Sequence, residues 1–566
     1  TPDILFSRRQ AFVQTEQLRL NSYTNEQIRM SDTITASFPP LNQSMLQQQH
    51  AASDRELPTA FLIGLLTVTI ICIAALERVT RVSVESREPP LLKPRIPIFG
   101  HILSFIRKPS EYFIELRQKH NVEVATLQLA HAKVYVVWSP AVVQSAFRSK
   151  ALSHDKYSLD FAQKVFGLSK GTIISLRSPE AVQERIQQRL IEAIHEGLIG
   201  QSLRNMTARA LGYLNEQVSS LAVDNQRLEI PNLYVWLRNH ITLSVSNTLY
   251  GAKDPFREDP SLIQSLWDFE GDFTRLLLGS FVGKLLAPRA FNGRQRVQSA
   301  MINFYTSNSE LNDDVTPFIR TRAKLLRETG IPPEEIGRME MSFMFVATTG
   351  SVPTIFWLLA NVLQDQNLIQ ELRMEIEPLV LREHNVAELR VSAINENSCP
   401  LLISCWHEAI RISNQFLGTR HPLEDMIVSD KEGQNYLLKK DVPVIWTARA
   451  LHASTDAWGG DATTFRGDRF VNLQGKDKQK KKASFFPFGG GKHLCPGRVF
   501  AYNEIIPFTA ALLTGFDFTG LKPASVKMGP TRLGEGVMKP LHEGQDSSCM
   551  VKRREGWETV EWRMVF

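Results

Sequence analysis

The longest run of apolar residues in the chain lies near its start, at residues 59–76. This run, TAFLIGLLTVTIICIAAL, has no charged residue, and as a helix of about 27 Å it nearly spans the hydrocarbon core of a bilayer. A buried core helix and a cleaved signal peptide are the alternatives, but core helices are usually shorter and no small-residue cleavage site stands out. We therefore predict a transmembrane anchor over residues 58–77.

Polar and proline-rich segments flank this anchor. Residues 1–57 are rich in Gln, Asn, Ser and Thr without periodicity, which predicts a poorly ordered N-terminal extension. Arg78 and Arg81 follow the apolar run, and by the positive-inside rule they place the C-terminal side in the cytosol. Residues 78–101 contain four prolines and predict a stiff hinge. One large domain is predicted over residues 102–566.

Within that domain, apolar positions mostly recur at three and four residues, the spacing of an amphipathic helix. The helical stretches are 111–120, 141–149, 179–198, 264–281 and 400–412. The longest predicted helix begins at Pro333, which is followed by Glu334 and Glu335, and continues to about Leu363. The stretches 123–129 and 133–138 are β-rich. We predict a mainly α domain with smaller β regions, an α+β fold crossed by one long helix.

The composition excludes several classes of function but does not change the predicted fold. The net charge of +6 over 566 residues is too small to indicate nucleic-acid binding. The five cysteines form no C-x-x-C pair, so they indicate neither zinc nor a disulfide framework and fit a chain facing the reducing cytosol. They are Cys72, Cys399, Cys405, Cys495 and Cys549. One of them can have a chemical role while the others are buried or incidental.

Cys495 lies in the most distinctive segment of the sequence, FFPFGGGKHLCPGR. Three successive glycines allow a sharp turn and a close approach to a flat ligand. The residues from Val499 onward have the spacing of a helix, and a thiolate is stabilised near a helix N-terminus. A thiolate can be an axial ligand of heme iron and then favours O–O cleavage. A structural cysteine in a glycine turn is the alternative that this segment alone leaves open.

Three charged residues precede this segment. Glu408 and Arg411, at i and i+3, share a helix face and can pair. Arg469, in the segment FRGDRF, lies between them and Cys495 in the chain. A buried glutamate is tolerated when arginines pair with it. Because E-x-x-R occurs by chance in many helices, this spacing gains meaning only together with the other two segments.

Together these segments resemble the cytochrome P-450 superfamily. The family's heme-loop pattern, F-x-x-G-x-x-x-C-x-G, is matched by Phe488, Gly491, Cys495 and Gly497. Its E-x-x-R helix is matched by Glu408 and Arg411. Arg469 matches the arginine of its P-E-R-F segment, although this chain has Gly467 and Asp468 at the first two positions. The resemblance implies a heme-thiolate catalytic domain with a long central helix over the heme, preceded by the anchor and hinge.

The resemblance also implies a role for each matched residue. Cys495 is expected to be the proximal ligand of the iron of heme b. Around it, the heme-binding set is expected to be Phe488, Gly491, His493, Gly497 and Arg420. A solvated loop position is the alternative for His493. The residues expected to brace the loop without taking part in chemistry are Glu408, Arg411 and Arg469. The family's W-x-x-x-R contact to a propionate has no match near residues 175–195.

The long helix departs from the family over residues 347–359, ATTGSVPTIFWLL. Family members commonly have an acid and a threonine there for proton delivery, and this stretch has no acid. Pro353 cannot donate a backbone hydrogen bond and frees the carbonyl of Thr349. The candidate catalytic residues are Thr349, Gly350 and Ser351. Two interpretations stay open: the hydroxyls order water beside a kinked helix, or they bond back to their own backbone.

The GSVPTIFW segment and, more weakly, DFAQKVFGLS resemble the branch that holds sterol hydroxylases of bile-acid synthesis and prostacyclin synthase. That branch contains monooxygenases and also isomerases of peroxides, which need no electron donor. A basic cluster before the heme loop favours a monooxygenase, because basic patches steer acidic reductases, although a solvated loop is the alternative. The cluster comprises Lys476, Lys478, Lys480, Lys481 and Lys482.

The sequence therefore predicts a single-pass protein of the endoplasmic reticulum membrane with a cytosolic heme domain. NADPH-cytochrome reductase is its expected partner, and the expected activity is monooxygenation of a lipophilic small molecule such as a steroid, terpenoid, polyketide or fatty-acid derivative. An isomerase or dehydratase of a peroxide, and a non-catalytic heme-binding protein, are the alternatives. The substrate is not predictable, because the residues that contact it lie in variable loops.

Overall fold

The computed structural model describes residues 82–566, except 95–99, 154–157, 224–225, 431 and 523–525, together with a few positions before residue 79. The chain divides into two compact units, Thr1–Arg78 and Val79–Phe566. In the first unit, positions 66–71 are helical and their apolar side chains are more than half exposed. The predicted extension over residues 1–57, Cys72 and much of the predicted anchor lie outside the described residues. The transmembrane span therefore stays a prediction.

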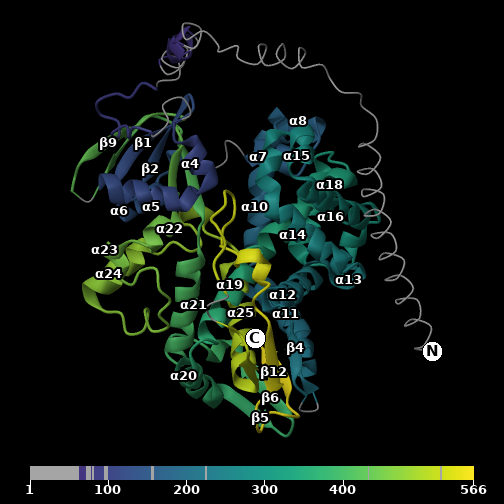
Figure 1. The fold of residues 1–566 in the computed structure, drawn as a ribbon. Coiled ribbons are helices and arrows are strands. Elements are labelled where there is room, and N and C mark those ends of the chain that lie inside the picture. Colours follow the sequence, from purple (N-terminus) through teal and green to yellow (C-terminus); the bar gives the residue numbers. More distant parts are fainter. Residues whose placement is uncertain are drawn as a thin grey trace, which may run out of the picture. The chain divides into compact units, whose positions relative to one another are not determined.

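The second unit is mainly helical, with small sheets (Figure 1), which confirms the predicted fold class. The helices of its N-terminal half are α4 Ile102–Arg107, α5 Pro109–His120, α6 Pro140–Arg148, α7 Ser158–Val165, α8 Lys170–Leu176, α9 Pro179–Gln183, α10 Ile186–Gly197, α11 Gly200–Ser220, α12 Leu233–Tyr250, α13 Pro255–Glu258, α14 Ser261–Asp272, α15 Ser280–Leu286 and α16 Pro288–Thr306. Those of its C-terminal half are α17 Pro317–Glu328, α18 Pro333–Thr348, α19 Ser351–Val362, α20 Gln366–Ile376, α21 Pro400–Ser413, α22 Ala448–His452, α23 Thr455–Trp458, α24 Gly475–Ser484 and α25 Arg498–Gly515.

Strands gather in four small sheets. The largest has the order β1-β2-β10-β7-β3, formed by β1 Val124–Leu129, β2 Ala132–Val137, β10 Val444–Thr447, β7 Leu417–Pro422 and β3 Leu152–Ser153. Its β1 and β2 are the two predicted strands, joined as an antiparallel pair. The other sheets comprise β11 Phe516–Thr519 with β12 Cys549–Arg553 and β4 Leu228–Ile230, β13 Glu561–Val565 with β6 Val386–Arg390 and β5 Val380–Glu383, and β8 Met426–Ser429 with β9 Asn435–Leu438.

Part of the predicted hinge belongs to the largest sheet. The amide of Leu92 donates to the carbonyl of Thr126 in β1 over 3.0 Å, and the Thr126 amide donates to Pro90 over 2.9 Å. Glu88 is buried and pairs with Lys133 of β2 at 2.7 Å. Prolines at the edge of a sheet remove no central ladder bond, so this segment extends the sheet edge. The domain therefore starts ahead of Glu88 and not at residue 102.

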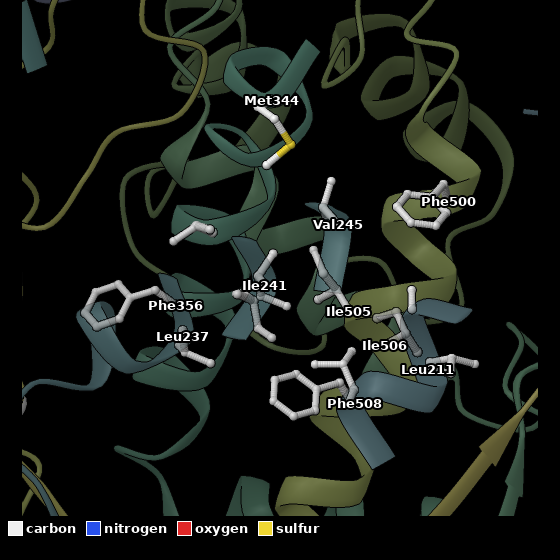
Figure 2. Packing of buried hydrophobic residues seen from close by; sticks show 14 of the residues in the cluster. Leu211, Leu237, Ile241, Val245, Met344, Phe356, Phe500, Ile505, Ile506 and Phe508 are labelled. Carbon is white, nitrogen blue, oxygen red and sulfur yellow. The ribbon is translucent and has the colours of Figure 1, made fainter. Parts of the chain in front are cut away.

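Helices from distant parts of the chain meet in one large core (Figure 2). Ile241 and Val245 of α12 lie between Met344 of α18 and Ile505 of α25, and all four side chains are at most 2% exposed. Burying each such side chain stabilises the fold by about 1.5–3 kcal/mol. This packing fixes α18 and α19 against α25, the helix that follows the cysteine loop.

The long central helix begins at Pro333 as predicted, with Glu334 and Glu335 in its first turn. It is interrupted after Thr348 and resumes at Ser351, so the predicted span to about Leu363 is matched by two consecutive helices. The interruption fits Pro353, which has no amide hydrogen for the carbonyl of Thr349. The combined run, Pro333–Val362, is the one described helix long and apolar enough to cross a membrane, and most of it is buried in the core.

Two other predicted helices are also divided. The stretch 179–198 forms α9 and α10, separated at Arg185, whose backbone has φ of 56°. The stretch 264–281 divides into α14, a 3-10 turn at Phe273–Leu278 and α15, where Gly279 has φ of 97°. Apolar periodicity continues across both breaks, so periodicity alone does not reveal them. The remaining predicted helices lie within two residues of their expected bounds.

Candidate functional site

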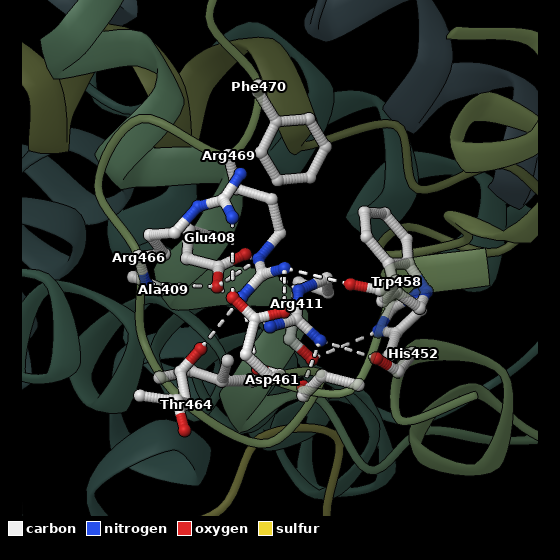
Figure 3. Close-up of polar contacts among 12 residues, drawn as sticks. Glu408, Ala409, Arg411, His452, Trp458, Asp461, Thr464, Arg466, Arg469 and Phe470 are labelled. Carbon is white, nitrogen blue, oxygen red and sulfur yellow. Dashed lines mark hydrogen bonds and ion pairs between the residues drawn. The ribbon is translucent and has the colours of Figure 1, made fainter. Parts of the chain in front are cut away.

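The acid and two arginines singled out in the sequence form one buried cluster (Figure 3). Arg411 forms two hydrogen bonds with Glu408, from Nε at 2.6 Å and from Nη2 at 2.7 Å. Arg469 Nε donates to Glu408 Oε1 at 2.8 Å. All three side chains are at most 1% exposed. Bidentate pairing of this kind is what makes a buried carboxylate tolerable.

Backbone carbonyls satisfy the rest of both guanidinium groups. Arg411 Nη1 donates to the carbonyls of His452 and Ala462 at 2.5 and 2.6 Å. Arg469 donates to Trp458 at 3.0 Å and to Thr464 at 3.1 Å. Hydrogen bonds to Asp461 and Glu408 raise the pKa of Arg469 despite the opposing effect of burial. The cluster therefore fixes the loop between α22 and α24.

This cluster is continuous with the segment that leads to Cys495. Burial and the nearby Arg411 lower the pKa of His452 to about 3, so its ring is neutral. Its Nδ1 lies 3.2 Å from the carbonyl of Arg411, and its Nε2 accepts from the amide of Phe486 over 3.0 Å. Asn414, which ends α21, donates to the carbonyl of Pro487 over 3.0 Å. The α21 helix thus braces the heme-loop segment from two directions.

Gly467 shows why the chain departs from the family's P-E-R-F pattern. A Cβ atom at this position would lie 3.0 Å from Cys405 Sγ and 3.2 Å from Leu368. Asp468 points to the surface and pairs with Arg466 at 2.9 Å. The glycine therefore leaves room for the buried cysteine of α21, and the departure does not disturb Arg469.

The cysteine loop begins at Phe488, whose carbonyl accepts from the Cys495 amide at 3.0 Å. Gly489 and Gly491 have φ of 73° and 62°, in the region that favours glycine. A Cβ at Gly491 would lie 2.1 Å from the carbonyl oxygen of Phe147 in α6, and one at Gly490 would overlap the Phe147 ring. These two glycines therefore permit close packing of the loop on α6, a contact that the sequence did not predict.

Cys495 lies just before α25, as predicted, and its thiol is partly buried. Burial raises the pKa of this thiol, and the backbone amides of Gly497 and Arg498 at the helix N-terminus oppose that rise only in part. Such amides stabilise a thiolate once a cation replaces the proton. The Arg498 guanidinium donates to the Cys495 carbonyl at 3.0 Å and fixes the turn. The sulfur thus lies at the N-terminus of α25, the position that the sequence predicts for a ligand.

The other described cysteines are different. All three are buried, and burial raises the pKa of Cys399 and Cys549 to about 12 and that of Cys405 still higher. A thiol in such surroundings behaves as a small apolar side chain. Burial raises the pKa of Cys495 too, but that thiol alone among the described cysteines is only partly buried.

On the distal helix, most hydroxyls bond to their own backbone. Thr348 donates to Met344 at 2.7 Å and Thr354 donates to Gly350 at 2.7 Å. Ser351 makes a longer bond, 3.4 Å, to Ala347. Thr349 is partly exposed, and its hydroxyl has no hydrogen bond to any described residue. The hydroxyls of Thr348 and Ser351 therefore bond back to their own backbone, which is the second of the two interpretations of the sequence. The hydroxyl of Thr349 is the one left for water or ligand.

The remaining predicted site residues lie on separate elements. Arg420 is buried in β7, with its guanidinium 5.4 Å above the Trp446 ring. His493 ends the 3-10 turn Gly491–His493 of the cysteine loop. The predicted basic loop is a helix, α24, and Lys481 is mostly buried and pairs with Asp477 at 2.9 Å. Its exposed lysines are Lys476, Lys478, Lys480 and Lys482.

Comparison with known proteins decides the family. The family model described as Cytochrome P450 matches residues 89–543. The chain belongs to the cytochrome P450 family. A cytochrome P450 monooxygenase of Gibberella zeae is 32% identical over 85% of this chain and 92% of its own length. The human 7-alpha-hydroxycholest-4-en-3-one 12-alpha-hydroxylase is 25% identical over 81% of this chain and 92% of its own. A cytochrome P450 monooxygenase of Hypoxylon pulicicidum is also 25% identical, over 81% and 88%.

This P450 is therefore an oxygen-incorporating oxidoreductase whose cofactor is heme b. Its residues fit that cofactor, because Cys495 offers a single, partly buried sulfur just ahead of the N-terminus of α25. One protein thiolate suffices as iron ligand when a macrocycle supplies the equatorial donors. When bound, heme b supplies the redox centre for oxygen chemistry. The chain's own contribution is to hold that sulfur in place through α21, α25 and the Glu408 cluster.

Sequence reasoning missed two buried polar groups near these elements. Glu504 of α25 is 1% exposed and accepts from Ser244 of α12 at 2.7 Å, and burial raises its pKa to about 8. Lys539, near the C-terminus, forms ion pairs with Glu270 and Glu535. An acid inside the apolar run VFAYNEIIPF was a usable signal for Glu504. No local pattern marks Lys539, because its partners are far away in the sequence.

Proposed function

We propose that this P450 hydroxylates or oxidises a lipophilic small molecule, of the steroid, terpenoid, polyketide or fatty-acid kind, with electrons from an NADPH-cytochrome reductase. The observation that carries the proposal is the position of Cys495, whose partly buried thiol lies just ahead of the N-terminus of α25. The relatives from Gibberella and Hypoxylon are described as monooxygenases, and the human relative as a hydroxylase of a sterol-like ketone. These names support a lipophilic substrate here.

Each site residue has a proposed task. Cys495 binds the iron, Phe488 packs near the sulfur and Gly497 supplies an amide to it. Gly491 lets the loop pack on α6, where a Cβ would meet the Phe147 carbonyl. His493 and Arg420 bind the propionates by charge and hydrogen bonding. The residues that hold this loop without contacting the cofactor are Glu408, Arg411 and Arg469.

Proton delivery is assigned to the interruption between α18 and α19. The Thr349 hydroxyl orders a water molecule there, since it has no hydrogen-bond partner among the described residues. Gly350 leaves space beside it, because a Cβ at that position would meet no atom within 4 Å. Ser351, bonded weakly to Ala347 at 3.4 Å, is free to exchange that bond for the water. These three positions take the place of the family's acid and threonine.

Attachment to the endoplasmic reticulum membrane is proposed with the heme domain on the cytosolic side. The apolar run at 59–76 supports it, as does exposed apolar surface on the second unit itself. Phe281 is 85% exposed and Leu285 is 73% exposed on α15, with Leu278 just before it at 60%. Side chains of this kind favour the interface of a bilayer over water.

Electron supply separates the proposed activity from its alternative, an isomerase or dehydratase of a peroxide. The exposed lysines of α24 support docking of an acidic reductase. Product formation that requires NADPH, reductase and oxygen is the expected result. Turnover of a hydroperoxide with no electron donor would instead establish the isomerase.

The ligand assignment is tested with carbon monoxide. The reduced protein is expected to give the red-shifted Soret band of a thiolate-ligated heme, and Cys495→Ser is expected to lose it. Cys549→Ser is the matched control, because Cys549 is buried in β12 and lies outside the loop. Retention of the band in Cys495→Ser would contradict the assignment.

A further inference from the structure

Five phenylalanines gather beside the distal helix. Phe345 of α18 lies one turn before Thr349, and its carbonyl accepts from the Thr349 amide at 3.2 Å. Its ring lies 5.0 Å from that of Phe273 and 5.3 Å from that of Phe269, measured between centroids. Phe166 and Phe161 extend the group. Because i and i+4 share a helix face, these rings border the face that carries Thr349.

A buried ion cluster adjoins these rings. Glu270, the residue after Phe269 in α14, forms an ion pair with Lys539. Lys539 Nζ also lies 3.2 Å from Glu535 Oε1, and the three side chains are 4–12% exposed. Gly534, next to Glu535, packs on the aromatic group, since a Cβ there would lie 2.5 Å from Phe273 Cζ. The ion pairs therefore hold α14, and with it the adjoining phenylalanine rings, against the segment 532–539.

That segment is itself fixed to both sides of the site. Gln415 donates through its amide to Gly536 at 2.9 Å and through Nε2 to Glu535 at 2.9 Å. The Trp357 indole of α19 donates to the Met538 carbonyl at 2.6 Å. Asn414, adjacent to Gln415, holds Pro487 at the start of the cysteine loop. Lys539 thus links the aromatic group on α14 to the distal helix and to the cysteine loop.

We infer that the Glu270–Lys539–Glu535 cluster sets the size of ligand that this P450 admits beside Thr349, by holding Phe269 and Phe273 against Phe345. Lys539 is a positioning residue, since it acts through the rings and does not touch the ligand. Without its cation, two buried carboxylates repel each other and α14 is released. A bulky ligand then no longer has to displace the rings, so its affinity rises, whereas the affinity of a small ligand does not change. This inference rests on the proposed function, which assigns proton delivery to the turn at Thr349.

The test uses three nitrogen ligands that bind heme iron directly and differ in size: imidazole, 4-phenylimidazole and clotrimazole. Their dissociation constants are measured from the Soret shift of the intact protein. Lys539→Met is expected to tighten clotrimazole about tenfold and to change imidazole by less than about twofold. Lys324→Met is the matched control, because Lys324 is 76% exposed and pairs only with Glu328 at 3.8 Å.

Two further variants separate positioning from general damage. Lys539→Arg keeps the charge and is expected to restore the wild-type ratio of clotrimazole to imidazole affinity. Phe273→Ala is expected to favour clotrimazole as well, and adding Lys539→Met to it is expected to give clearly less than the sum of the two effects, because Phe273 is one of the two rings that Lys539 holds. If Lys539→Met lacks the thiolate band with carbon monoxide, Glu270→Gln replaces it.

An unchanged affinity ratio in the Lys539 or Glu270 variant overturns the inference. Additive effects of the Phe273 and Lys539 changes, or equal shifts for all three ligands, also overturn it. If the wild-type protein binds none of the three, it is the heme-thiolate assignment that fails and not this inference alone.

Discussion

The two faces of the heme site differ in how they handle polar groups. On the cysteine side, Glu408, Arg411 and Arg469 form ion pairs, are almost completely buried, and have hydrogen bonds in several directions. On the distal side, the interruption of the long helix carries no charge, and Thr349 keeps a hydroxyl without a described partner. The cysteine side thus has buried ion pairs at the loop itself, whereas the turn at Thr349 presents neutral groups and the ion pairs of Lys539 adjoin only the phenylalanine rings beside it.

This difference follows from the tasks of the two faces. A metal ligand must stay in one position, and a paired network of buried charges costs too much to open partly. A substrate face must accept water, oxygen and an apolar molecule in turn, which neutral hydroxyls allow at little cost. Buried ion pairs therefore adjoin the segment that leads to Cys495 and are absent from the turn at Thr349.

The largest effect is expected from breaking the charged face. Glu408→Gln leaves two buried guanidinium groups facing a neutral amide, and we expect a loss of about 3–5 kcal/mol in the free energy of unfolding. Denaturant unfolding followed by the heme absorbance measures it. Arg320→Ala, which breaks an exposed pair with Asp313, serves as the control and is expected to leave the unfolding midpoint unchanged. Equal losses in the two variants would contradict the assigned role of burial.

Glu504 can be compared with Glu408, because it is also a buried acid but has no arginine partner among the described residues. Burial raises its pKa to about 8, whereas the unfolded value is about 4.3. Between these pH values the unfolded chain loses a proton that the folded chain keeps, so stability falls as pH rises through this window. Glu504→Gln removes that cost and is expected to stabilise the protein by roughly 2–4 kcal/mol at pH 7.5 and much less at pH 5.

Unfolding curves at both pH values check this expectation. Glu328→Gln, at a side chain 54% exposed, is the matched control and is expected to give no such dependence on pH. The same stability change for Glu504→Gln at pH 5 and pH 7.5 would show that the carboxyl is ionised in the folded protein.

A smaller effect is expected on the distal face. Thr349→Val keeps the shape of the side chain and removes its hydroxyl, and we expect the yield of product per NADPH to fall about tenfold. Thr348→Val is the control, because that hydroxyl is bonded to Met344 and faces the core. If both variants lose the same share of product, proton delivery does not depend on Thr349.

Much of the charged face was predictable from the sequence, because each of its motifs combines local spacing with a chemical need. Cys495 ahead of a helix, the Glu408–Arg411 pair and the third partner Arg469 all lie where the motifs indicate. Local patterns also gave α5, α6, α21 and the β1–β2 pair. The type of residue was enough to predict these contacts, because a buried carboxylate requires a base as its partner.

The rest depends on contacts between distant segments. No spacing reveals that Gly490 and Gly491 accommodate Phe147, or that Lys539 bridges Glu270 and Glu535. The breaks at Arg185 and Gly279 were missed because apolar periodicity continues across them. Residues 88–92 were predicted to be a hinge because of their prolines, but their carbonyls and amides join the edge of a sheet. Contacts between distant segments determine the structure at such positions, and these contacts cannot be predicted from one sequence.

The smallest effect is expected from changes to the exposed lysines of α24, on the cysteine side. Replacing Lys476, Lys478, Lys480 and Lys482 by alanine removes four exposed charges, and we expect the apparent KM for reductase to rise about threefold to tenfold at low salt. The difference is expected to vanish at about 0.5 M salt, because screening then shortens the reach of the lysines to a few ångströms. Lys253→Ala and Lys324→Ala, also at exposed positions, are the controls. A salt-independent loss of kcat would mean that α24 supports the fold of the cysteine face, as Lys481 does through Asp477, and does not guide a partner.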